Sequence, residues 1–151
     1  RIYGKPGGRR RGGGIGTAII KKIKERYAEE VEVWALGTNA IATAQMMKAR
    51  SNRGATGENA ICHCAQQVDF IAGSVSILIA NAMMGEVTPA IARAIGESRA
   101  TKLLLPLTQE PVVIVGTVRE PLPHIVEKLV CEHLCSYLPP GQTAECPPPT
   151  P

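Results

Sequence analysis

The chain has 151 residues, 44% of them hydrophobic and only 3% aromatic, which suits one domain with an aliphatic core. Its formal charge of +4 belongs to the first eleven residues, because without their five basic side chains 12 basic residues face 13 acidic ones. This argues against a nucleic-acid-binding surface, and the longest uncharged stretch, 70–84, is shorter than the roughly 20 residues that span a bilayer.

Apolar spacing predicts helices and strands in the first half of the chain. Ile15, Ile19 and Ile23 fall on one face of an amphipathic helix over 15–28. Thr38 or Asn39 can cap the second helix with a side-chain oxygen. The elements expected after the first helix are a buried strand at 31–37, a helix at 41–50, a loop at 51–57 and a helix at 58–67.

The second half continues the alternation. Thr88 followed by Pro89 predicts a helix start, since the hydroxyl caps and proline loses no donor at the first helical position. The other expected elements are a strand at 68–73, strands at 102–107 and 111–118, and a final helix at 121–138. The segment at 74–84 fits either a strand or a buried helix, and its length favours the helix. Six of the twelve prolines lie in 139–151, which predicts a disordered or extended tail.

This order predicts an α/β fold of the Rossmann-like type, a three-layer sandwich with a mostly parallel central sheet. We expect a basic Gly/Arg-rich segment at 1–11, one domain at 12–138 and the proline-rich tail at 139–151. Sheets of this kind bind ligands at the carboxyl ends of their strands. The segment before residue 9 is a poor strand, so the N-terminal strand is expected to be degraded.

The glycines that precede the first helix form the first candidate ligand site. Gly12, Gly14 and Gly16 would let backbone N–H groups approach a phosphate at a helix amino end. The alternative is a glycine turn that does no more than connect a strand to a helix. The weak strand before the loop leaves both interpretations open.

The second candidate site follows the strand at 31–37. NAD sites usually carry an acidic residue there for the ribose hydroxyls, but Gly37, Thr38 and Asn39 take the position. The missing acid disfavours NAD and leaves NADP or another nucleotide open. In the next loop, Arg53 offers guanidinium donors and Gly57 allows close backbone approach; an ordinary surface loop is the alternative.

The remaining reactive side chains point to no definite chemistry. Five cysteines without a secretory signal favour free thiols in a cytoplasmic protein. Cys62 and Cys64 lie two apart on a predicted helix, and Cys131 and Cys135 on the last one, so packing is favoured over zinc and no metal is expected. Glu58 and Glu86 are the best-placed carboxylates, although neither has an evident partner.

Five blocks of sequence resemble a known family. They are, in order, GGGIG, ALGTNAIAT, NRGATGENA, GEVTPAIARAIGES and KLLLPL. Over residues 12–135 the chain resembles an uncharacterised family of short bacterial proteins, a domain of unknown function (DUF3842). The resemblance implies a compact Rossmann-type fold and supplies no activity or catalytic residue. The family's start resembles an apolar strand ending in aspartate and glycine, where this chain has Arg9 and Arg10; frame errors at both ends are one hypothesis.

These observations favour a cytoplasmic protein that binds a nucleotide or another phosphorylated small molecule at the strand carboxyl ends. Catalysis would need residues from a second subunit, which favours a homodimer. The alternative is a non-enzymatic regulatory or assembly protein that acts through a homo-oligomer or partner interface. An NAD(P)-dependent oxidoreductase is weaker, because Tyr27 is followed four residues on by Val31 and not by lysine.

Overall fold

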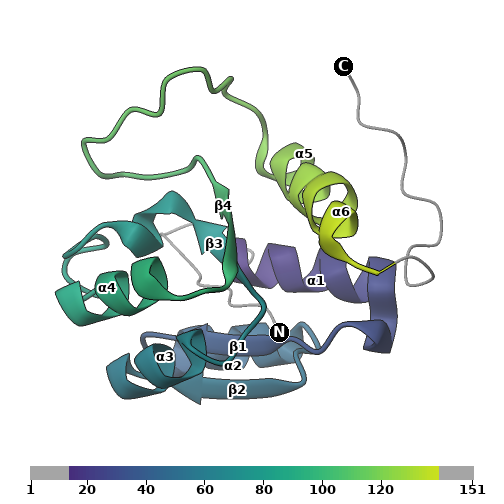
Figure 1. Cartoon of the computed structure of the whole chain (residues 1–151), viewed down its shortest axis with the longest axis horizontal. Helices are drawn as coiled ribbons and strands as arrows, with labels where there is room; N and C mark the ends of the chain where they lie inside the picture. Colours follow the sequence, from purple (N-terminus) through teal and green to yellow (C-terminus); the bar gives the residue numbers. More distant parts are fainter. Residues whose placement is uncertain (1–13, 140–151) are drawn as a thin grey trace.

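The computed structural model describes residues 14–139, in which helices alternate with short strands (Figure 1). The first half contains α1 (Ile15–Tyr27), η1 (Ala28–Glu30), β1 (Trp34–Gly37), α2 (Ala40–Lys48), β2 (Arg53–Thr56) and α3 (Glu58–Ala65). The second half contains β3 (Phe70–Ser74), η2 (Val75–Leu78), α4 (Pro89–Glu97), β4 (Thr101–Leu105), α5 (Leu122–Glu127), η3 (Lys128–Leu134) and α6 (Cys135–Tyr137). The segments predicted at 1–11 and beyond 139 fall outside the described residues, apart from Pro139.

All strand pairing within 14–139 is parallel, which confirms the α/β class. β1 pairs with β2, with Trp34 opposite Arg53, and β3 pairs with β4, with Phe70 opposite Thr101. The sequence predicted one central sheet, whereas the described residues form two separate sheets of two strands. The carboxyl ends of β1 and β2 lie together because the strands run in the same direction.

Both sheets share the same two hydrophobic layers. Ala35 of β1 and Ala72 of β3 belong to one cluster, which we call the α1 cluster, with side chains of α1, α5 and η3. Leu36 and Ile71, the neighbouring strand residues, belong to the other, the α3/α4 cluster. Successive strand side chains point to opposite faces, so helices cover both faces of each strand pair.

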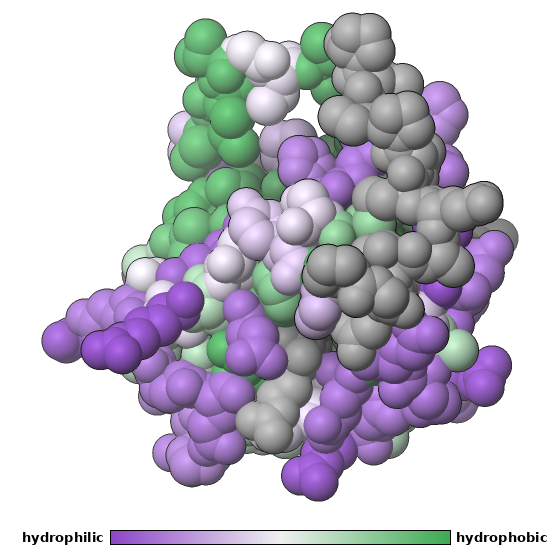
Figure 2. Space-filling view, turned by 45° about the vertical axis from the view of Figure 1, so that its right-hand side comes forward, coloured by the Kyte–Doolittle hydropathy of each residue, from purple (hydrophilic) through white to green (hydrophobic). Residues whose placement is uncertain are grey.

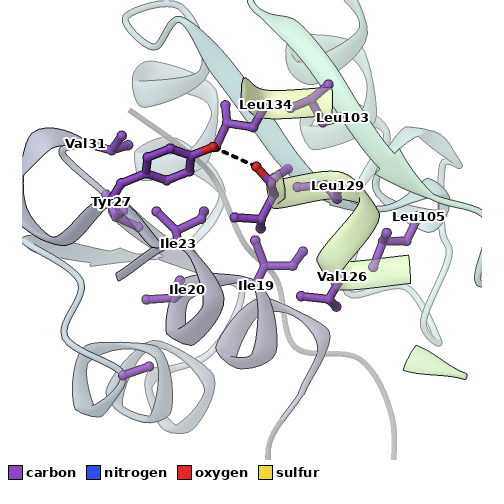
Figure 3. Packing of buried hydrophobic residues seen from close by; sticks show 14 of the residues in the cluster. Ile19, Ile20, Ile23, Tyr27, Val31, Leu103, Leu105, Val126, Leu129 and Leu134 are labelled. Atoms are coloured by element: carbon purple, nitrogen blue, oxygen red, sulfur yellow. Dashed lines mark hydrogen bonds between the residues drawn. The ribbon is translucent and has the colours of Figure 1, made fainter. Parts of the chain in front are cut away.

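The α1 cluster is built on isoleucines from the amphipathic face of α1, as the sequence predicted. Ile19, Ile20 and Ile23 are fully buried against side chains of β4 and the last helical segment (Figure 3). The Tyr27 hydroxyl donates a hydrogen bond of 2.8 Å to the backbone carbonyl of Val130 in η3. This segment, predicted as one helix over 121–138, is α-helical at its ends and a π-helix over Lys128–Leu134.

Three predicted elements differ from the structure. Residues 53–56, predicted as loop, form β2; its side chains are largely exposed, so no apolar pattern marked it. The predicted helix at 74–84 is only the short η2, which ends at Leu78 because Ile79 is extended (φ −101°, ψ 114°). The helix does not resume after it, since Asn81, Met83 and Met84 take the left-handed conformation that a right-handed helix excludes. Residues 111–118, predicted as a strand, form no strand and belong to a long connection between β4 and α5.

Among residues 14–139, no helix has the length and apolarity needed to span a membrane.

Candidate functional site

Thr38 and Asn39 lie just beyond the carboxyl end of β1, where they hold a carboxylate. The Thr38 hydroxyl donates to Oε2 of Glu86 and the Asn39 amide to Oε1, each over 3.3 Å. Asn39, one of the two residues that the sequence offered for this role, also caps α2, since its Oδ1 accepts from the N–H of Ala42 over 2.8 Å. All three polar side chains are exposed to solvent or partly so. This edge therefore presents a carboxylate that two side-chain donors hold in place.

A close approach between β1 and α2 positions Thr38 and Asn39. A Cβ on Gly37 would lie 2.3 Å from Oγ1 of Thr43, nearer than any real contact allows. Thr43 is buried, and its hydroxyl donates to the carbonyl of Asn39 over 3.1 Å and accepts from the Thr56 hydroxyl over 2.8 Å. Glycine at 37 therefore lets the first turn of α2 sit directly on the strand ends.

Gly57 stands beside the same edge, at the start of α3. Its N–H donates to the carbonyl of Gly37 over 2.9 Å, which continues the β1–β2 ladder by one step. Its φ of +103° is a conformation that side chains rarely adopt. The structure thus brings Gly57 together with residues 37–39.

The structure does not bring Arg53 to this edge. Arg53 begins β2, opposite Trp34 at the amino end of β1, about 10 Å along the strand from Gly37. Its guanidinium lies 5.6 Å from the Trp34 ring centroid and forms an ion pair of 3.4 Å with Glu32. The exposed Arg53 side chain is therefore engaged at the opposite end of the sheet.

The amino end of α1 contains an unsatisfied buried hydroxyl. Gly14 is the extended N-cap residue, and Gly16 lies buried in the first turn; Gly12 is outside the described residues. No side chain caps this helix among residues 14–139. The Thr17 hydroxyl, in the same turn, is buried and has no hydrogen-bond partner among residues 14–139. Because buried hydroxyls are nearly always paired, the Thr17 hydroxyl calls for a partner that the described part of the chain does not supply.

Sequence reasoning missed Thr17 and did not connect Glu86 with Thr38. A threonine directly after a glycine run at a helix start was the available signal for Thr17, since phosphate loops often carry a hydroxyl there. For Glu86 no local signal exists. It follows the left-handed turn at 83–85, and its partners Thr38 and Asn39 lie 48 and 47 positions earlier in the chain.

The cysteines do not form a metal site within 14–139, where no group of three or more ligating side chains gathers. Cys62 and Cys64 have free thiols, whereas Cys135 is disulfide-bonded, which corrects the expectation of a free thiol at that position. Burial raises the pKa of the Cys62 and Cys64 thiols above the ordinary value, so both stay protonated at neutral pH.

Comparison with known proteins adds a family and no activity. No curated protein and no solved structure matches the chain. A family model described as Domain of unknown function (DUF3842) matches residues 9–137, which include every element described above up to Tyr137. The chain is therefore a member of the DUF3842 family.

Proposed function

We propose that the protein binds a nucleotide or another phosphorylated small molecule, with a phosphate at the amino end of α1. The observation that carries this proposal is the buried Thr17 hydroxyl, which has no hydrogen-bond partner in the part of the chain that the structure describes. A phosphate oxygen would accept this hydrogen bond. The site would then resemble other anion sites in which a helix amino end and a hydroxyl act together.

The surroundings of Thr17 favour an anion. The N-cap, Gly14, has no side chain to satisfy the first N–H groups of α1, and the first turn carries no acidic residue. A helix of 13 residues has a positive partial charge at its amino end. Uncapped N–H groups and this dipole attract the same kind of ligand as the Thr17 hydroxyl.

The group at the end of β1 would bind a part of the ligand that carries hydroxyls. Glu86 supplies from another loop the carboxylate that residues 37–39 lack. In nucleotide sites a carboxylate at such a strand end accepts hydrogen bonds from ribose hydroxyls. Thr38 and Asn39, which hold the two Glu86 oxygens, would keep this acceptor in place. Gly57 would leave the neighbouring edge open. These contacts suit ATP, NAD or a related compound with free ribose hydroxyls, because a carboxylate would repel the additional ribose phosphate of NADP.

The first experiment removes the Thr17 hydroxyl. In Thr17→Val, the shape is kept and an unsatisfied polar group is lost, so the free energy of unfolding should stay equal or rise. The shift in melting temperature on adding ATP, NAD, NADP or inorganic phosphate should disappear. Thr43→Val is the matched control, because it removes a bonded hydroxyl and should lower stability by about 1–2 kcal/mol. Lower stability of Thr17→Val, or an unchanged ligand shift, would contradict the proposal.

A second pair of variants tests the hydroxyl acceptor. Glu86→Gln should weaken binding of the nucleotide that gives the largest shift, and leave or strengthen binding of inorganic phosphate, which needs no acceptor. Arg53→Ala should change neither, since Arg53 lies at the other end of β2. Isothermal titration of the wild type, Glu86→Gln and Arg53→Ala measures the binding of both ligands. Equal loss of phosphate and nucleotide binding in Glu86→Gln would exclude Glu86 as the acceptor for the ligand hydroxyls.

A second candidate function, assembly into a homo-oligomer, is favoured by an apolar arm. We define the arm as residues 106–121, between β4 and α5. Val113, Val115 and Val118 in it are 87%, 92% and 77% exposed. Figure 2 shows apolar side chains gathered at the top of the molecule, where the arm lies. A contiguous exposed apolar segment of this kind is typical of a protein interface.

The arm is anchored at both ends. The Ser76 hydroxyl donates to the Thr108 hydroxyl over 2.8 Å, and the N–H of Met83 donates to Glu110 over 3.0 Å. At the other end Lys128 pairs with Glu120 over 2.7 Å. These contacts hold the exposed valines in one place, and the arm of a second copy would cover them with the same apolar side chains.

A further inference from the structure

Ser74, at the carboxyl end of β3, has a buried hydroxyl that donates to no residue within 14–139. Six serine and threonine side chains are buried in this part of the chain, namely Thr17, Thr43, Ser51, Ser74, Ser76 and Ser98. Four of the six donate a hydrogen bond to another described residue. The two exceptions are Thr17 and Ser74. The Ser74 oxygen accepts from the N–H of Ser76 over 3.2 Å, so its proton is the group that still needs a partner.

The register of the second sheet places the Ser74 side chain on the face that α1 covers. Ala72 of β3 and its partner Leu103 of β4 both belong to the α1 cluster. Two residues further along, Ser74 is paired with Leu105, which belongs to the same cluster. Side chains two residues apart in a strand share a face. Ser74, only 2% exposed, therefore enters the layer of α1 at the carboxyl end of the sheet.

The amino end of α1 lies at the carboxyl ends of the strands. Near the other end of the helix, Lys24 bonds Asn52 over 2.6 Å, and Asn52 accepts from the N–H of Val33, which precedes β1. The carboxyl end of α1 is therefore fixed at the amino ends of β1 and β2, and the 13 residues of the helix extend back by about 20 Å. The carboxyl ends of β1 and β3 lie together, since Glu86, beyond β3, bonds Thr38, beyond β1.

Thr17 and Ser74 consequently lie at the same end of the α1 layer. Ile19 follows Thr17 by two residues and belongs with Leu105 to the α1 cluster. Figure 3 shows Ile19 on the side of Leu105 and Tyr27 on the opposite side. Because Leu105 is the partner of Ser74 in the sheet, the two buried hydroxyls without an acceptor among residues 14–139 belong to one region.

We propose that Ser74 is a second binding residue for the phosphate at the amino end of α1, to which its hydroxyl donates a hydrogen bond. This inference rests on the proposed phosphate site at Thr17. One phosphate has enough acceptor oxygens for both hydroxyls and for the first N–H groups of α1. Both hydroxyls belong to buried side chains, and hydrogen bonds to an anion are strong where water is excluded. The phosphate is thus held between a helix and a strand end.

The test is isothermal titration of the full chain with inorganic phosphate. In Ser74→Ala, the dissociation constant for phosphate should rise by roughly tenfold or more, because a hydrogen bond to a charged group is lost. Ser74→Cys covers the case in which Ser74→Ala unfolds. The thiol keeps most of the volume of the side chain but is a weak donor, so phosphate affinity should fall in the same direction.

Ser98→Ala is the matched control. Ser98 is also buried, and it accepts from the N–H of Ala100 two residues on, as Ser74 does from Ser76. Its hydroxyl proton, however, is already donated to the carbonyl of Ala65. Ser98→Ala should therefore lower the urea midpoint of unfolding at least as much as Ser74→Ala and leave phosphate binding unchanged.

The outcomes separate this inference from the proposed function. If Thr17→Val loses phosphate binding while Ser74→Ala and Ser74→Cys bind as wild type does, the role of Ser74 is wrong and the proposed function stands. A loss of binding in Ser98→Ala as large as in Ser74→Ala would also overturn the role of Ser74, because the loss would then follow from destabilisation. A wild type that binds neither phosphate nor a nucleotide would overturn both.

Discussion

Gly37 determines the geometry at the end of β1 because it has no side chain. Gly37→Ala would put a methyl group 2.3 Å from Oγ1 of the buried Thr43. We expect a loss of about 1–3 kcal/mol in the free energy of unfolding, from strain and a displaced α2. Urea denaturation measures it.

Gly96→Ala is the matched control for this variant, because Gly96 lies in α4 and a Cβ there meets nothing within 4 Å. Alanine in a helix should stabilise by up to about 1 kcal/mol. Equal effects of the two variants would show that β1 and α2 do not approach each other as described.

Tyr27 is the residue that joins α1 to the last helical segment. Tyr27→Phe removes the donor to the Val130 carbonyl and should cost about 1 kcal/mol near neutral pH. Burial, and then the nearby charge of Cys131, raise the Tyr27 pKa above its ordinary value of 10.0. The folded protein therefore keeps the phenol proton at a pH where the unfolded chain loses it.

The sign of the pH dependence follows from this raised pKa. The stability that Tyr27 contributes is fully present below pH 10.0 and is lost as the pH rises through the folded-state pKa. We expect the stability difference between wild type and Tyr27→Phe to narrow above pH 10. A difference that widens with pH, in urea unfolding between pH 8 and 11, would contradict the burial of the phenol.

At the scale of elements, one polar network connects α1, η1, β1 and the start of β2. The ammonium of Lys24 is buried, and its shortest contact is with Oδ1 of Asn52 at 2.6 Å. The same oxygen accepts from the N–H of Val33 over 2.8 Å, and the Asn52 amide donates to Glu29 over 3.0 Å. The amino ends of β1 and β2 are thus fixed to the carboxyl end of α1.

Removing Asn52 should therefore be costly. In Asn52→Ala, the buried Lys24 ammonium loses its nearest acceptor, and we expect a loss of about 2–3 kcal/mol, measured by thermal and urea unfolding. Glu29→Gln, which changes an exposed partner of the same lysine, should cost much less stability than Asn52→Ala. If the two variants are equally stable, the network does not hold these elements together.

At the scale of the whole molecule, the exposed arm predicts self-association. Val113→Ser combined with Val115→Ser should shift sedimentation at equal concentration from dimer to monomer, because the apolar surface shared by two copies is lost. Ile41→Ser, which removes a single exposed side chain outside the arm, should leave the distribution as in wild type. A monomeric wild type at high micromolar concentration would refute an interface formed by the arm.

The sequence by itself determined the elements whose signal is local. α1 carries three isoleucines at helical spacing, and α4 begins with the Thr88 cap and Pro89; both helices lie where they were predicted. The placement of Asn39 at the cap of α2 was equally readable, because a cap bonds its own helix. Local spacing and short-range hydrogen bonds are properties of a few neighbouring residues.

Tertiary structure alone decided the features that depend on distant partners. β2 has exposed side chains without an apolar pattern, and it becomes a strand because β1 supplies its hydrogen bonds. Residues 111–118 are rich in β-branched side chains and yet form no strand within the described residues. Glu86 reaches Thr38, and Arg53 is drawn to Trp34, through contacts that no window of sequence contains. A backbone or side chain takes the partner that the fold brings within reach, and that partner lies elsewhere in the chain.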